Sequence, residues 1–271
     1  MDLPELVRLS LAEDLGAGDV TTRATVDPTL RGRARVVAKQ ALVVCGQAPA
    51  AEVYRQLGAT WTPVVPDGQP AASGQLVGEA EGTLAHLLSG ERVALNFLMH
   101  LSGIATHTRD VVAGAGTLRV LDTRKTTPLH RALEKYAVRC GGAYSHRFGL
   151  YDGVLIKDNH IVAAGGITVA IRRARQFAHH LLKVECEVED LDELREALAA
   201  GADVILLDNM DDATLREAVA INAGRALLEA SGNMTAERIA RMVDIGVDCV
   251  SMGGLIHQAR WADLSMRIVG G

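Results

Sequence analysis

The sequence predicts an α/β protein, with a mixed α/β region in the N-terminal third followed by a parallel sheet that closes towards a barrel. Two observations carry this prediction. From residue 118 onward, short aliphatic runs alternate with helical patterns at least six times, and repeated βα units of this kind build a parallel sheet. The chain also has 271 residues, of which 48% are hydrophobic, enough for a large core in one or two domains.

The N-terminal third is expected to mix helices and strands, because its apolar residues change period several times. Gly58 follows a helical pattern and suits a helix C-cap. Pro and Gly are frequent between residues 60 and 82, which favours short strands joined by turns. We expect helices at 3–14, 49–58 and 83–113, the last broken near Ser89 and Gly90, and strands at 33–46 and within 60–82.

Six short runs in the remainder of the chain are predicted to be the parallel strands. Helical patterns such as 191–201 and 234–246 fill the gaps between them. The predicted strands are LRVLD (118–122), GVLI (153–156), VECEV (184–188), DVILL (203–207), ALLEA (226–230) and DCVSM (248–252).

Polar residues lie at the end of each of these six strands, and the carboxyl ends of parallel strands meet at one face. A charged residue there is costly unless it is paired or used. The cations at or near the ends form one group in a chain whose net charge is −5. Local cations in an acidic protein indicate a small anionic substrate rather than a polymer. The group comprises Arg124, Lys125, His146, Arg147 and Lys157.

Two further features at the strand ends point to phosphate chemistry. Glu187 and Asp208 end successive strands, and paired carboxylates beside a phosphate site often hold Mg²⁺, although either could instead pair with a lysine. The turns Ser231-Gly232-Asn233 and Gly253-Gly254 are small, and helical patterns follow them. Their backbone N–H groups could cradle a phosphate, although glycine also serves simple turns.

Composition argues against several other classes of protein. The net charge of −5 and an aromatic content of 3% argue against a nucleic-acid partner. No apolar run approaches the roughly 20 residues of a membrane span, and the N-terminus lacks a basic leader pattern. None of the four cysteines lies in a CxxC pair, which favours reduced core thiols in a cytoplasmic protein over a structural zinc site or a catalytic thiol.

Ordered motifs along almost the whole chain resemble the quinolinate phosphoribosyltransferase family of type II phosphoribosyltransferases. The resemblance is strongest in HRFGLYDGVLIKDNH, which ends a longer matching block. In chain order the motifs are EDLGAGDVTT (13–22), GERVALNFLMHLSGIAT (90–106), LDTRKTTP (121–128), EKYAVRCGGAYSHRFGLYDGVLIKDNH (134–160), ILLDNM (205–210), LEASGN (228–233) and MGGLIH (252–257).

The resemblance implies an N-terminal α/β sandwich domain plus a seven-stranded incomplete α/β barrel. We therefore predict one domain at 1–112, to which a tail at 261–271 returns, and a catalytic barrel at 113–260. The seventh strand is expected between residues 134 and 148. The implied reaction joins quinolinate to phosphoribosyl pyrophosphate with Mg²⁺, giving nicotinate mononucleotide, pyrophosphate and CO₂, in a homodimer or larger oligomer with shared active sites.

The resemblance also implies a role for individual residues. Lys125 would stabilise charge on the diphosphate, and Glu187 and Asp208 would place Mg²⁺ and the ribose hydroxyls. Arg92 would reach into the pocket of a partner subunit. The two quinolinate carboxylates would be held by Arg124, His146, Arg147 and Lys157, and the 5′-phosphate region by Ser231, Gly232, Gly253 and His257.

Three residues depart from the family pattern, and three other functions stay open. Leu129 stands where glycine is usual, and Ala143 and Ser145 replace Gly and Asn before His146, so loop geometry and affinity could differ. One rival is a related type II phosphoribosyltransferase of the molybdenum-transport-associated kind. The others are a metabolite-binding barrel without turnover and a barrel enzyme that forms a Schiff base at Lys157.

Overall fold

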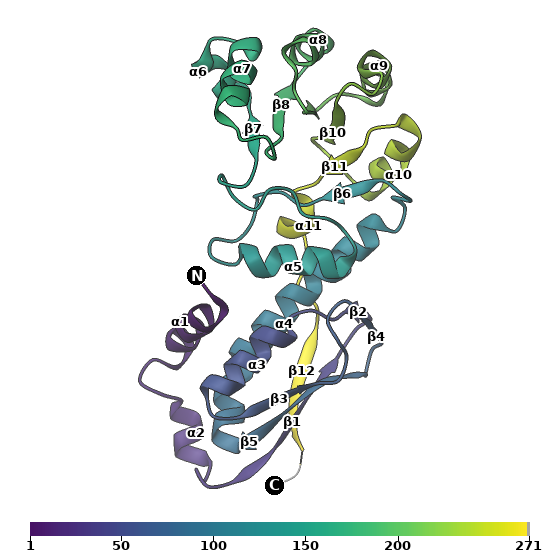
Figure 1. Ribbon diagram of the computed structural model, residues 1–271. Coiled ribbons are helices and arrows are strands. Elements are labelled where there is room, and N and C mark those ends of the chain that lie inside the picture. Colours follow the sequence, from purple (N-terminus) through teal and green to yellow (C-terminus); the bar gives the residue numbers. More distant parts are fainter. Residues whose placement is uncertain (270–271) are drawn as a thin grey trace. The chain divides into compact units, whose positions relative to one another are not determined.

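The computed structural model describes residues 1–269 and divides into two compact units (Figure 1). The first unit contains residues 1–109, 126–142 and the described residues from 258 onward, and the second contains 110–125 and 143–257. The domain limits predicted from the sequence stay predictions, and residues 270–271 of the predicted tail lie outside the described part.

A four-stranded antiparallel sheet forms the centre of the first unit. Its order is β12 (Leu264–Val269), β1 (Arg31–Ala38), β5 (Leu76–Thr83) and β3 (Thr60–Pro63). The short strands β2 (Leu42–Val43) and β4 (Pro70–Ala71) pair separately. The unit therefore joins strands from the start of the chain to one that comes after the whole second unit.

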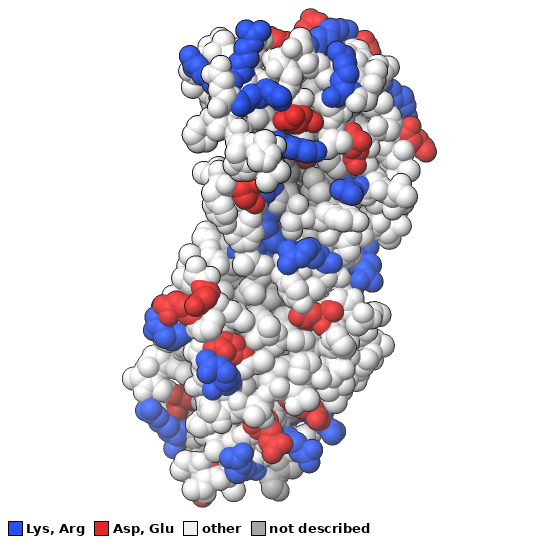
Figure 2. Space-filling model, in the orientation of Figure 1, with Lys and Arg blue, Asp and Glu red and all other residues white. Residues whose placement is uncertain are grey.

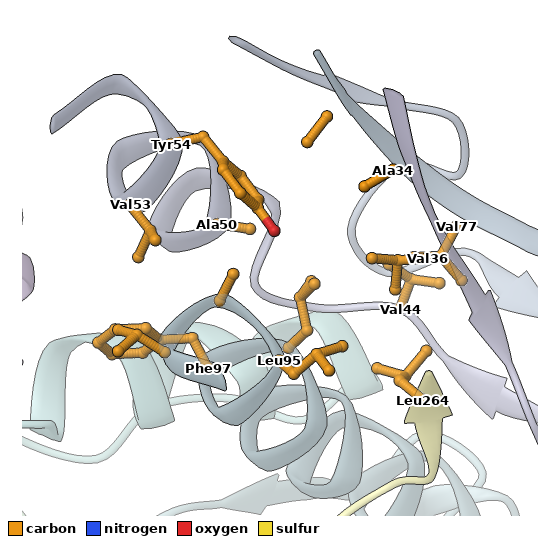
Figure 3. Close-up of a cluster of buried hydrophobic side chains, with 14 of the residues drawn as sticks. Ala34, Val36, Val44, Ala50, Val53, Tyr54, Val77, Leu95, Phe97 and Leu264 are labelled. Carbon is orange, nitrogen blue, oxygen red and sulfur yellow. The ribbon is translucent and has the colours of Figure 1, made fainter. Parts of the chain in front are cut away.

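Helices of the first unit pack on this sheet through aliphatic side chains. Ala34, Val36 and Ala38 alternate along β1 and are buried, as one face of a half-covered strand requires. Figure 3 shows Tyr54 and Leu95 reaching the same core from two different helices. The helices are α1 (Leu3–Leu15), α2 (Val20–Thr25), α3 (Gln47–Gln56), α4 (Leu84–Val112, whose end enters the second unit) and α5 (Arg131–Gly141).

Helix α4 runs without interruption through Gly90, so the predicted break there is wrong. A Cβ atom at Gly90 would lie 2.9 Å from Leu57 Cδ1 and 3.1 Å from Tyr54 Cε1. The glycine therefore permits close packing against α3 and the residue that follows it, at a cost in helix propensity.

The second unit is built on a six-stranded parallel sheet flanked by helices. Its order is β6 (Arg119–Leu121), β11 (Cys249–Ser251), β10 (Leu227–Ser231), β9 (Val204–Asp208), β8 (Val184–Val188) and β7 (Val154–Ile156). Within the described residues β6 and β7 stay unpaired with each other, so the sheet is open. The helices are α6 (Asp158–Ala164), α7 (Ile167–Phe177), α8 (Leu191–Ala200), α9 (Asp212–Asn222), α10 (Ala236–Ile245) and α11 (Gly254–His257).

The seventh strand, expected between residues 134 and 148, is reduced to one parallel bridge between Tyr144 and Leu121. Tyr144 N–H donates to Val120 O at 2.8 Å, and Asp122 N–H donates to Tyr144 O at 3.0 Å. Beyond this point His146 N–H donates to the Asp122 side chain at 2.9 Å. That bond takes the place of the next ladder bond, so the pairing stops.

Side chains alternate between the two faces of the parallel sheet. One face is aliphatic and fully buried, with residues such as Ile205, Leu207 and Ala230. The opposite face carries the polar residues, because positions two apart on a strand share a face. This polar face holds Glu185, Glu187, Asp208, Glu229, Ser231 and Ser251.

Candidate active site

The loop after β6 brings Lys125 beside the turn after β11. Lys125 N–H donates to Thr123 Oγ1 at 3.1 Å. A Cβ atom at Gly253 would lie 2.7 Å from Lys125 Cδ and 3.3 Å from His257 Nε2. A side chain at Gly253 would therefore displace Lys125, and the structure brings together three of the predicted site residues.

Lys157 and Glu187 form an ion pair across neighbouring strands β7 and β8. Lys157 follows the last residue of β7, and Glu187 is buried with 9% of its surface exposed. Asp208 ends β9, and its Oδ2 accepts a hydrogen bond from Asn209 Nδ2 at 2.7 Å. The lysine pairing that the sequence left open for the carboxylates therefore occurs at Glu187.

Glu187 and Asp208 also offer a donor set that fits Mg²⁺. Both supply carboxylate oxygens, which are the ligands that Mg²⁺ prefers, and they lie near the carboxyl ends of adjacent strands. Mg²⁺ usually keeps several waters and needs only one or two carboxylates beside substrate phosphates. The chemistry of these residues is therefore compatible with the predicted metal.

His146 contacts two buried glutamates on the polar face of the sheet. Its Nε2 lies 3.3 Å from Glu185 Oε2 and 3.6 Å from Glu229 Oε1. Glu185 and Glu229 have exposed fractions of 8% and 2%. Burial and the neighbouring Glu185 raise the pKa of Glu229 to about 7. Burial opposes a charge on His146, but the two carboxylates outweigh it and raise the pKa of His146.

Arg147 is held at both ends, by its backbone and by its guanidinium group. Its N–H donates to His146 Nδ1 at 2.7 Å, and its Nη1 donates to Gly153 O at 2.9 Å. Burial and the positive charge of Arg124 lower the pKa of Arg147. Two arginines with unfavourable charge interactions are a natural place for an anionic ligand.

The turn after β10 is held by the side chains of Asn209, Asn233 and Arg238. Gly232 has φ +90°, and a Cβ atom there would lie 2.1 Å from Asn209 Oδ1. Asn233 Nδ2 donates to Asn209 Oδ1 at 3.2 Å, and Arg238 Nη1 donates to Gly232 O at 2.8 Å. Ser231 ends β10 and accepts Asn209 N–H through its carbonyl at 3.0 Å.

Several residues beside the site were assigned no individual role from the sequence, because their signal there is weak. Glu185 and Glu229 lie within the apolar runs VECEV and ALLEA and were assigned no role, although an acid inside such a run is itself a signal. Asn209 and Asn233 have φ values of +54° and +48°, which asparagine tolerates better than most residues. Nothing in the sequence pattern marks Arg238, whose partners are two backbone carbonyls and the carboxylate of Asp212.

Arg92 and Leu129 belong to the first unit and are described there. Arg92 is exposed on α4. Leu129 has φ +69° and is 65% exposed, so a leucine occupies a backbone conformation that favours glycine. This conformation costs a leucine roughly 1–2 kcal/mol, and the glycine that the sequence resemblance predicts at this position would avoid that cost.

Comparison with known proteins identifies the family. The family models for the N-terminal and C-terminal domains of quinolinate phosphoribosyl transferase match residues 19–102 and 104–267. The chain belongs to the quinolinate phosphoribosyltransferase family. It is 42% identical to a probable nicotinate-nucleotide pyrophosphorylase (carboxylating) of Bacillus subtilis, over 99% of this chain and 94% of that relative.

Other members of the quinolinate phosphoribosyltransferase family give the same result. A mitochondrial quinolinate phosphoribosyltransferase (decarboxylating) of Nicotiana glauca is 38% identical over 98% of this chain and 82% of its own. The structure of the nicotinate-nucleotide pyrophosphorylase from Francisella tularensis matches with a TM-score of 0.94 and 39% identity, covering 98% of this chain and 96% of that one. The predicted α/β class and family are therefore confirmed. The parallel sheet has six strands, and the expected seventh strand is the single bridge at Tyr144.

Proposed function

We propose that this chain transfers the phosphoribosyl group of phosphoribosyl pyrophosphate to quinolinate and removes one carboxylate as CO₂. The products are nicotinate mononucleotide and pyrophosphate, a step of NAD biosynthesis. The observation that carries the proposal is the cationic and acidic set at one edge of the parallel sheet, in a chain of this family. Both substrates are small anions, as the local cations favour.

Quinolinate has two carboxylates, and we assign them to the cations around Arg147. Arg124 and Arg147 suit this role because a guanidinium group pairs with a carboxylate through two parallel hydrogen bonds. Lys157 adds a further positive charge, and its contact with Glu187 keeps it oriented before substrate binds. Binding the two anionic substrates side by side is a large part of the catalysis, because they repel each other in solution.

The chemical step separates charge between the ribose and the leaving group. As the bond from C1 of the ribose to pyrophosphate breaks, the quinolinate nitrogen forms the new bond to C1. Lys125 stabilises the negative charge that gathers on pyrophosphate. Glu187 and Asp208 would hold Mg²⁺, which when bound would neutralise part of the charge on the diphosphate.

Decarboxylation follows from the same substrate position. The ring nitrogen is positively charged once it is bonded to C1, so the ring accepts the electron pair of the bond to the 2-carboxylate as CO₂ leaves. The carbon then takes up a proton. No covalent bond to the protein is needed.

The 5′-phosphate of the substrate is assigned to the turns after β10 and β11. Ser231, Gly232, Gly253 and His257 lie in or beside these turns. The space that a side chain at Gly232 would take is filled by Asn209, so we assign the phosphate to the backbone N–H groups of these turns.

A direct assay tests the proposal. Purified protein is incubated with quinolinate, phosphoribosyl pyrophosphate and Mg²⁺, and nicotinate mononucleotide and CO₂ are measured, with parallel tubes that contain nicotinate or EDTA instead. We expect product from quinolinate alone and none with EDTA. Quinolinate binding without product would contradict the proposal and favour a related transferase or a metabolite-binding protein.

We further propose that the protein acts as a homodimer with shared active sites and works in the cytoplasm. Arg92 is exposed on α4 and free to enter a neighbouring protomer's pocket. The four cysteines are free thiols, which suits a reducing compartment. Within the described residues, we find no helix with the length and apolarity needed to cross a membrane.

Subunit mixing tests the shared site. Arg92→Ala and Lys157→Ala proteins are each expected to be inactive, and mixing them should restore part of the activity because one site of each mixed dimer is intact. Absence of recovery, with subunit exchange shown by a tag, would count against the shared site.

A further inference from the structure

The imidazole of His146 has partners on both of its nitrogens. Nδ1 accepts the backbone N–H of Arg147 at 2.7 Å, and Nε2 faces Glu185 at 3.3 Å and Glu229 at 3.6 Å. An N–H group donates, so Nδ1 carries no proton in this arrangement. The ring proton therefore lies on Nε2, between the two carboxylates.

The two glutamates need such a donor. Both are more than nine-tenths buried, and Oε1 of each has no hydrogen-bond partner among the described residues. Neighbouring buried carboxylates are costly without donors, because each loses its hydration and the two repel each other. The Nε2–H of His146 lies between Oε2 of Glu185 and Oε1 of Glu229 and offsets part of this cost.

The raised pKa of His146 favours a doubly protonated ring, whereas the hydrogen bond to Nδ1 favours a neutral ring. The carboxylates favour a second proton on the ring, but that proton would have to sit on Nδ1, facing the Arg147 N–H only 2.7 Å away. The contact to the backbone is the shorter and more specific of the two constraints. It holds the ring as the neutral Nε2–H form.

The same ring fixes the backbone that carries Arg147. His146 N–H is held by Asp122 Oδ1 at 2.9 Å, and Arg147 N–H is held by His146 Nδ1. Two consecutive amides are thus anchored next to the guanidinium group, which is itself held by Gly153 O. This arrangement sets the direction of Arg147 before a ligand arrives.

We propose that His146 is a positioning residue, locked by Glu185 and Glu229 in its Nε2–H form, which orients Arg147 for a substrate carboxylate. This differs from the direct contact with quinolinate that the family resemblance implies for His146. The proposal rests on the proposed function in one respect, namely that Arg147 binds a quinolinate carboxylate. The glutamates act through His146 and do not touch substrate.

The first test is made on the free protein and is independent of activity. Two-bond ¹H–¹⁵N spectra of ¹⁵N-histidine protein, with His146 assigned by its loss in His146→Gln, report which ring nitrogen carries the proton. We expect the Nε2–H form at pH 7.5, unchanged when quinolinate is added. The Nδ1–H form, a doubly protonated ring, or a switch of form on quinolinate binding would overturn the proposal.

The same spectra distinguish the proposal from a metal site. The ligand atoms of His146, Glu185 and Glu229 lie within 4.8 Å of one another, a spacing that a divalent cation could use. A cation on Nε2 would move the ring proton to Nδ1. Titration with Zn²⁺ or Mn²⁺ is expected to leave the Nε2–H signal in place, and its loss at stoichiometric metal would overturn the proposal.

The second test is a double-mutant cycle on quinolinate kinetics. His146→Ala should lower kcat/KM for quinolinate about tenfold to a hundredfold in the native background, mainly through KM. In an Arg147→Ala background the same change should cost less than about threefold, because the residue it orients is gone. Equal losses in both backgrounds would show that His146 binds substrate by itself.

A conservative variant separates positioning from simple packing. His146→Gln keeps a donor near the place of Nε2 and should regain most of the activity that His146→Ala loses. Glu229→Gln keeps an acceptor and should be close to the native enzyme, while Glu229→Ala should behave like His146→Ala. The variants should raise KM for quinolinate more than KM for phosphoribosyl pyrophosphate. An equal rise in both KM values would contradict the proposal.

Discussion

A change at Lys125 is expected to separate stabilisation of the leaving group from binding of quinolinate. It lies beside Gly253 and His257, in the loop after β6. We expect Lys125→Ala to lower kcat by about a hundredfold or more while KM for quinolinate changes little, because charge on pyrophosphate develops only during the reaction. Steady-state kinetics measures both.

Lys183→Ala is a suitable control for this variant. Lys183 is exposed and precedes the amino end of β8, whereas Lys125 follows the carboxyl end of β6. The control should leave both kinetic constants unchanged. If Lys125→Ala reduced kcat and quinolinate affinity to the same extent, its assignment to the pyrophosphate side would be wrong.

The raised pKa of Glu229 predicts how the free energy of unfolding depends on pH. Its pKa in the folded protein is about 7, whereas a glutamate in the unfolded chain titrates near 4.3. Between about pH 4.3 and pH 7 Glu229 is protonated in the folded protein and ionised in the unfolded chain. Its contribution to the free energy of unfolding is therefore fully present below the unfolded pKa and is lost as pH rises through the folded pKa. The loss should be roughly 1–3 kcal/mol.

Urea unfolding at pH 5 and pH 8 measures this effect. Glu229→Gln removes the titrating group while keeping its shape, so the difference in unfolding free energy between the two pH values should shrink in the variant. An identical pH dependence in both proteins would show that Glu229 is not the source.

Residues at strand ends could be predicted from the sequence, whereas their partners could not. Lys157 and Glu187 were selected because charges interrupt aliphatic runs, but their pairing depends on β7 and β8 being neighbours in the sheet. The setting of His146 was harder still. It lies in a loop that shows no period, and its contacts come from β8 and β10, about 40 and 80 residues further along the chain.

At the scale of elements, the turn after β10 offers a matched pair of glycines. Gly232 and Gly165 both have φ +90°, but a Cβ atom at Gly232 would meet Asn209 whereas at Gly165 nothing lies within 4 Å. Gly232→Ala should raise KM for phosphoribosyl pyrophosphate about tenfold, because the turn must open to admit the methyl group. Gly165→Ala should cost only stability.

A rise in KM that is equal for the two variants would mean that backbone strain, rather than the turn's geometry, is responsible. Isothermal titration with phosphoribosyl pyrophosphate would confirm that binding, and not turnover, has changed.

Helix α4 shows why a glycine in a helical pattern is ambiguous. Gly90 was interpreted as a break, yet it lies within a continuous helix of 29 residues. The sequence around it is helical on both sides, and only the packing of α3 against α4 explains the glycine. Propensity alone could not reveal this, because it says nothing about which neighbour needs the space.

Two glycines of α4 should differ in their cost when they are changed to alanine. At Gly90 the added Cβ would meet the end of the Leu57 side chain at 2.9 Å, whereas at Gly103 it would meet the backbone oxygen of Arg260 at 2.1 Å. A side chain can move more easily than a backbone, so Gly103→Ala should lose about 2–4 kcal/mol and Gly90→Ala about 0–2 kcal/mol. Thermal and urea unfolding would rank them, and the reverse order would contradict this account.

For the whole molecule, the order of the βα units was the strongest signal. Each of the six predicted parallel strands is found within one or two residues of its predicted position. The expected seventh strand does not form, because only Tyr144 pairs with β6. Two residues later the His146 N–H donates to the Asp122 side chain instead of to the backbone of β6. Local pattern cannot distinguish one bridging residue from a strand.

The surface of the molecule agrees with the charge arithmetic of the sequence. On the face drawn in Figure 2, acidic and basic side chains are interspersed, without a broad basic area. A net charge of −5 therefore does not conceal a large cationic area on that face. This is the distribution expected of an enzyme that gathers small anions into a local site rather than one that binds a polyanion.

The pairing of β12 with β1 has a consequence for synthesis on the ribosome. β1 leaves the ribosome early, but its neighbour β12 is translated only after all of the second unit. Until then one edge of β1 stays open to pairing with other chains, a recognised route to aggregation. The second unit can complete its sheet during this interval, so a nascent chain is expected to hold a finished parallel sheet while the sheet of its first unit is still incomplete.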